Sequence, residues 1–77
     1  MRLMPIISKL QRSLLQKGRM IKVNQTQMYS ERRNAMLTRY TVIEKQTIDD
    51  VKKNVTLLET FKALDVVNLL KEINGGG

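Results

Sequence analysis

Basic side chains are the residues whose type and placement in this 77-residue chain best suit contact with a partner. Nine of the first 43 residues are Lys or Arg, and Glu31 is the only acidic one there. From Glu44 onward, five basic residues face six acidic ones, so the net charge of +7 comes from the N-terminal part. Nucleic-acid binding usually begins with such a footprint, because each neutralised phosphate releases condensed counterions. The residues expected to make these contacts are Lys9, Arg12, Lys17, Arg19, Lys22, Arg32, Arg33 and Arg39.

A protein partner is the alternative, indicated by apolar residues that lie among these cations. Exposed Met and Tyr beside Arg are typical of the centre of a protein interface. The residues expected to form it are Met28, Tyr29, Met36 and Leu37. A homodimer could cover them as well, together with an open sheet edge. The charge distribution slightly favours nucleic acid, for which Tyr29 and Tyr40 could also stack on unpaired bases.

Enzymatic chemistry has little support in this composition. The chain has no His and no Cys, so the commonest general base and the strongest nucleophile at neutral pH are absent. Asp49 and Asp50 could offer oxygen ligands to a hard cation, but neighbours in sequence seldom converge on one metal, and Lys52 and Lys53 follow directly. Neither a P-loop nor a dinucleotide-binding glycine pattern occurs. We therefore expect a binding protein rather than an enzyme, with no cofactor and no metal.

Length and hydropathy limit the kind of protein that this chain can form. A chain of 77 residues holds one domain at most, and domains of this size are only marginally stable. The absence of cysteine fits a reducing compartment. The apolar run near Met1 is too short for an export signal, and no stretch approaches the ~18 apolar residues of a membrane span. The expectation is a soluble cytoplasmic protein without membrane contact.

The first 18 residues predict an amphipathic helix. Pro5 suits its first turn and Gly18 suits its C-terminal cap. Apolar residues recur between them at helical spacing, namely Leu3, Ile6, Ile7, Leu10, Leu14 and Leu15.

Residues 19–30 and 35–45 predict a β-hairpin, because both segments are rich in β-branched residues, Tyr and Met. A two-residue turn at Arg32 and Arg33 would place Val23 opposite Val42, Gln25 opposite Tyr40 and Tyr29 opposite Met36. The predicted core face then carries Ile21, Val23, Tyr40 and Val42. This face becomes polar towards the turn, so the hairpin should extend past its helical cover as a finger tipped by Arg32 and Arg33.

The rest of the chain predicts a loop over 46–54, a third strand over 55–61 and a helix over 63–74. Thr47 and Asp50 could instead form a capping box, with one long helix beginning there and running through 55–61. The preferred fold is a single α+β domain over residues 1–74 in the order α-β-β-β-α, followed by a flexible glycine tail at 75–77. A three-stranded antiparallel sheet would have both helices packed on one face.

Three segments of the chain form a recognisable pattern, namely Lys9-Leu10-Gln11-Arg12-x-Leu14-Leu15-x-Lys17-Gly18, Ile21-x-Val23-Asn24-x-x-Gln27-Met28-Tyr29-Ser30 and Met36-Leu37-Thr38. This pattern resembles small uncharacterised proteins encoded by phages and prophages of Gram-positive bacteria. The likeness covers about residues 9–45 and is looser in the last strand and helix. It implies a bacterial cytoplasm and a phage-related task, either binding nucleic acid or redirecting a host protein. No site residue follows from it.

Overall fold

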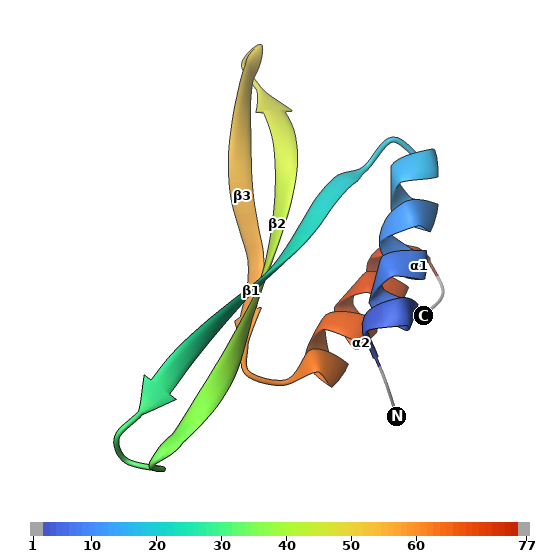
Figure 1. Ribbon diagram of the computed structural model, residues 1–77. Helices are drawn as coiled ribbons and strands as arrows, with labels where there is room; N and C mark the ends of the chain where they lie inside the picture. Colours follow the sequence, from blue (N-terminus) through green and yellow to red (C-terminus); the bar gives the residue numbers. More distant parts are fainter. Residues whose placement is uncertain (1–2, 76–77) are drawn as a thin grey trace.

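The computed structural model describes residues 3–75, which form two helices and one antiparallel sheet (Figure 1). The elements are α1 (Met4–Gln16), β1 (Met20–Ser30), β2 (Ala35–Ile48), β3 (Val51–Thr60) and α2 (Ala63–Ile73). The strands lie in the order β1-β2-β3, so β2 is central and each connection is a hairpin. The predicted α-β-β-β-α order is therefore confirmed. Of the predicted tail, only Gly75 falls within the described residues.

Helix α1 begins and ends as its sequence predicts. Pro5 lies in the first turn, and Gly18 adopts a φ of 83°, a left-handed conformation that favours glycine. The N–H groups of Lys17 and Arg19 each donate to the Leu14 carbonyl at 3.0 Å, closing the C-terminal end. Leu15 departs from the predicted apolar stripe, because its side chain is 58% exposed.

Both helices pack on one face of the sheet, the inner face, and on each other. Six residues are buried between these layers, namely Ile7 and Leu14 of α1, Val42 of β2, and Val66, Val67 and Leu70 of α2. The buried cluster includes Val42, and three other residues of the sheet pack against it, namely Ile21, Val23 and Tyr40. The predicted core face is therefore confirmed. The opposite side, the outer face, carries no helix in the described part of the chain.

The β1–β2 register is the predicted one, with Val23 opposite Val42 and Tyr29 opposite Met36. The loop between β1 and β2 differs from the predicted two-residue turn. The strands end one pair earlier than a two-residue turn would allow, at Ser30 and Ala35, and the loop spans residues 31–34. Asn34 closes the loop with a φ of 48°, a conformation that Asn tolerates better than most residues.

The predicted loop over 46–54 is wrong, and so is the alternative helix. Strand β2 continues to Ile48, a two-residue turn follows at Asp49 and Asp50, and β3 begins at Val51. Both aspartates have positive φ, 52° and 64°, as a type I′ hairpin turn requires. The segment is polar because it lies beyond β1 and the helices, so neither of its faces needs to be apolar.

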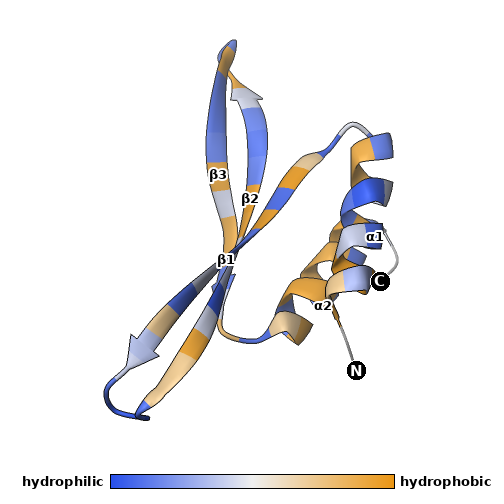
Figure 2. Cartoon of the chain, in the orientation of Figure 1, coloured by the Kyte–Doolittle hydropathy of each residue, from blue (hydrophilic) through white to orange (hydrophobic). Residues whose placement is uncertain are grey.

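The β1–β2 hairpin continues past β3 as a two-stranded arm, defined as residues 26–39. Pairing between β2 and β3 ends at Tyr40 and Thr60, and only β1 accompanies β2 beyond that point. Figure 1 shows this arm pointing away from both helices, as the predicted finger should. Figure 2 shows hydrophobic segments on both of its strands. Met28 and Met36 of the arm are exposed, so the arm carries apolar side chains that the core does not cover.

Candidate nucleic-acid interface

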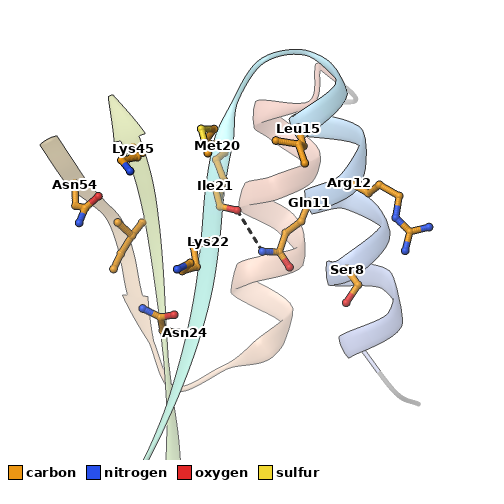
Figure 3. Close-up of a pocket in the computed structure, with 11 residues that line it drawn as sticks. Ser8, Gln11, Arg12, Leu15, Met20, Ile21, Lys22, Asn24, Lys45 and Asn54 are labelled. Atoms are coloured by element: carbon orange, nitrogen blue, oxygen red, sulfur yellow. Dashed lines mark hydrogen bonds between the residues drawn. The ribbon is translucent and has the colours of Figure 1, made fainter. Parts of the chain in front are cut away.

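A groove of about 680 Å³ runs along β1, between α1 and the outer face of the sheet (Figure 3). Three cations line it, Arg12 of α1, Lys22 of β1 and Lys45 of β2, and its lining contains no acidic side chain. The remaining lining residues are neutral or apolar, namely Ser8, Gln11, Leu15, Met20, Ile21, Asn24, Ile43 and Asn54. An anionic ligand would meet positive charge here without a competing carboxylate.

Helical spacing puts one flank of α1 on this groove. Because successive residues turn by about 100°, Ser8, Gln11, Arg12 and Leu15 share a flank beside the buried stripe. The Gln11 Nε2 atom donates to the Ile21 carbonyl at 3.3 Å, which fastens α1 to the edge of β1. In Figure 3, Arg12 lies at the rim and its guanidinium extends away from the strands.

The sheet register assembles the other wall of the groove. Lys45 lies between Met20 of β1 and Asn54 of β3, and Lys22 pairs with Ile43, so these side chains share the outer face. The cations on this face are Lys22, Arg39, Lys45 and Lys52, against one carboxylate, Glu59, at the β3 edge. Lys45 was absent from the predicted set, although its pairing with Met20 follows from the predicted register.

The structure divides the predicted cations into groups rather than one surface. Arg12 and Lys22 line opposite walls of the groove, whereas Lys9 is exposed on α1 and does not line it. Arg32 and Arg33 are exposed at the tip of the arm. Arg39 lies on the outer face of the arm, where its buried Nε has no hydrogen-bond partner among the described residues.

Arg19 forms an ion pair with the buried carboxylate of Glu44. Its Nε and Nη2 atoms donate to Oε2 and Oε1 of Glu44, each at 2.8 Å, on the inner face. Gln46 Nε2 also donates to Glu44 Oε1, at 3.1 Å. The hydrogen bonds from Arg19 lower the pKa of Glu44, against the opposing effect of its burial, and the same bonds raise the pKa of Arg19. The charge of Arg19, whose side chain is partly exposed, is therefore already paired with a carboxylate of the same chain.

Lys17 joins the C-terminal ends of the two helices. Its Nζ donates to the backbone oxygen of Asn74 at 2.9 Å and also to the side-chain oxygen of Asn74. The Asn74 amide in turn donates to Ser13 Oγ at 3.2 Å. A cation at this place also suits the negative end of the α2 dipole. Lys17 therefore has a structural contact, and a phosphate would have to compete with it.

The two tyrosines do not form a stacking platform. Tyr40 packs against the core on the inner face, away from the groove. Tyr29 is 57% exposed near the tip of the arm, where its hydroxyl donates to the Asn34 side chain. The groove itself contains no aromatic residue. This arrangement favours contacts with phosphate over base stacking.

The residues of the alternative protein interface do come together, as two cross-strand pairs in the arm. Met28 lies opposite Leu37 on the outer face, and Tyr29 lies opposite Met36 on the inner face. Met28, Tyr29 and Met36 are 39%, 57% and 59% exposed. The arm thus carries apolar contact area on both faces, directly behind the Arg32 and Arg33 tip.

Other kinds of site find no counterpart in residues 3–75. These residues contain no group of three or more acidic, His or Cys side chains that could hold a metal ion. Within the same range, neither helix has the length and apolar character needed to cross a membrane. Comparisons with protein-family models, curated proteins and solved structures found no match to the chain.

Proposed function

We propose that this protein binds nucleic acid through phosphate contacts made by the groove and the arm. The observation that carries the proposal is the groove itself, which three cations line without any acidic side chain. Arg19, by contrast, is paired with Glu44. The three groove cations have no carboxylate beside them in the lining, so their charge is available to an anionic ligand.

The composition of the groove favours recognition of the backbone over recognition of sequence. Lys22 and Lys45 supply point charges for phosphate oxygens, and Asn24 and Asn54 supply amides that can donate to phosphate or sugar. The arm can contribute further, because a two-stranded ribbon fits the major groove of duplex DNA. Arg32 and Arg33 at its tip would lead such an approach.

A titration of labelled duplex and single-stranded DNA and RNA at two salt concentrations tests this proposal. If about five phosphates are neutralised, log K on duplex DNA should fall with log salt at a slope of about −4 to −5. Charge reversal at Arg32 and Arg33 should weaken this binding, because the proposal places the tip of the arm against the nucleic acid. Absence of binding at ~50 mM salt, or binding indifferent to salt, would contradict the proposal.

A protein partner is the second candidate, supported by the apolar pairs of the arm. An inhibitor or adaptor could use Met28, Tyr29, Met36 and Leu37 as the centre of its interface and the arginines as its rim. Met28→Asp or Leu37→Asp should abolish such an interaction while leaving phosphate binding in the groove largely intact. A phage-related task in a bacterial cytoplasm is compatible with both candidates.

A further inference from the structure

The outer face of the arm is continuous with the groove. Side chains alternate between the two faces of a strand, and the register between β1 and β2 contains no shift over the whole length of β1. Lys22 and Lys45 of the groove therefore share their face with the outer side of the arm. Both helices pack on the opposite, inner face. A long polyanion held by the groove cations thus extends along the outer face of the arm rather than the inner one.

Arg39 lies on this outer face, opposite Thr26, with its guanidinium only partly covered. Its Nε atom is buried and has no hydrogen-bond partner among the described residues. An unpaired buried donor lowers stability, so its presence calls for an explanation. Within residues 3–75, Arg39 also forms no ion pair, although Glu59 lies on the same face. The cover over Nε restrains the guanidinium, and its two terminal nitrogens remain available to a ligand.

The protein changes width next to Arg39. Pairing between β2 and β3 ends at Tyr40 and Thr60, so Arg39 belongs to the first residue pair of the two-stranded arm. Strands lie about 5 Å apart, and the major groove of B-form DNA, about 12 Å wide, admits a two-stranded ribbon. Three strands beside α1 are too wide to enter it. Lys22, opposite Ile43, lies about 14 Å along the strand from Arg39, in the wide part, where the phosphates that border the groove would be in reach.

We propose that the arm lies in the major groove of duplex DNA with its outer face towards the bases, and that Arg39 reads a guanine. This inference rests on the proposed function and narrows its ligand to B-form DNA. Guanine presents two acceptors side by side, O6 and N7, which match the paired donors of a guanidinium. Met28 and Leu37 form an apolar pair on the same face, suited to the methyl group of thymine. Lys22 and Lys45 bind the flanking phosphates.

Selection of bound duplexes from a pool of random DNA sequence tests the reading of guanine. The unmodified chain should enrich one guanine and prefer it to the other bases by about tenfold or more. Arg39→Gln should lose this preference while keeping the slope of log K against log salt, because Arg39 contacts a base. Lys22→Gln is the matched control, since it removes the same charge from the groove: it should keep the guanine and lower the magnitude of the slope by about 1. Circular dichroism checks that both variants remain folded.

A change in the DNA gives a second test that a folding defect cannot imitate. With 7-deazaguanine at the enriched position, a carbon replaces the N7 acceptor, and the unmodified chain should bind about tenfold more weakly. Duplex RNA of the same sequence should show no base preference, because its major groove is too narrow to read. Salt-dependent binding without an enriched guanine, or a guanine preference that survives Arg39→Gln, would overturn this inference alone. Absence of binding to any nucleic acid at ~50 mM salt would overturn the proposed function as well.

Discussion

Arg19 and Glu44 form a two-pronged ion pair, with Nε and Nη2 of Arg19 each 2.8 Å from a separate carboxylate oxygen. Glu44 is 5% exposed, whereas the Arg19 side chain is 42% exposed. Arg19 directly precedes β1 and Glu44 lies on the central strand β2, opposite Ile21. The pair therefore ties the start of the β1 edge strand to the sheet.

Replacing Arg19 and replacing Glu44 should lower the free energy of unfolding by different amounts. Arg19→Gln removes the charged partner of the buried Glu44 carboxylate, which keeps its hydrogen bond from Gln46, and should cost about 2 kcal/mol. The cost is less than for a fully buried pair because Arg19 is partly solvated. Glu44→Gln leaves an arginine that water can reach, so it should cost less. Urea unfolding of the two variants measures the difference. Equal costs would show that burial of Glu44 does not matter.

The same pair should make stability depend on pH in the acidic range. The pKa of Glu44 is lowered in the folded protein, so its contribution is fully present above the unfolded glutamate value of about 4.3. It is lost as pH falls through the lower pKa of the folded state. Unfolding free energies of the unmodified chain and Arg19→Gln should therefore converge as pH falls below the unfolded value and through the lower folded one. A constant gap between them would contradict this linkage.

Two adjacent leucines of α1 should respond very differently to truncation. Leu14 is fully buried between α1, the sheet and α2, so Leu14→Ala should cost about 2–4 kcal/mol and unfold much of so small a domain. Leu15 is 58% exposed, and Leu15→Ala should change stability by less than about 0.5 kcal/mol. Thermal unfolding followed by circular dichroism checks both. Similar losses of stability for both variants would show that the core is not built around Leu14.

The second hairpin makes its own prediction at Asp50, whose φ of 64° favours glycine. Asp50→Gly should stabilise the protein by about 0.5–1 kcal/mol, because Gly adopts this conformation without a steric penalty. Asp50→Val should destabilise it, since a β-branched residue resists positive φ. The urea concentrations at the unfolding midpoints rank the stabilities of the two variants and the unmodified chain. If both variants match the unmodified chain, the turn is not centred on Asp49 and Asp50.

The sequence predicts this fold wherever an apolar pattern faces the helices. A turn centred on Arg32 and Arg33 sets Val23 opposite Val42, and this predicted register is the observed one, with both residues on the core face. The pattern fails over residues 46–54, because a two-stranded ribbon without helical cover has no apolar face. The Asp49–Asp50 turn also lacks the glycine that usually marks a type I′ hairpin.

The candidate site was less predictable than the fold. Cations are visible in a sequence, but their internal partners are not. The pairs Arg19–Glu44 and Lys17–Asn74 join residues 25 and 57 positions apart, and only the folded chain brings them together. Lys45 lies beyond the basic N-terminal part and reaches the groove through its register with Met20.

The most direct test of the groove compares two double variants of equal net charge in salt-dependent binding to duplex DNA. Lys22→Gln with Lys45→Gln removes two groove cations, and Lys62→Gln with Lys71→Gln removes two exposed cations outside it. The groove variant should bind more weakly, and the magnitude of its slope of log K against log salt should fall by about 2. The control should keep the slope of the unmodified chain. Equal slopes for the two double variants would mean that net charge alone attracts the DNA, and would contradict a binding site in the groove.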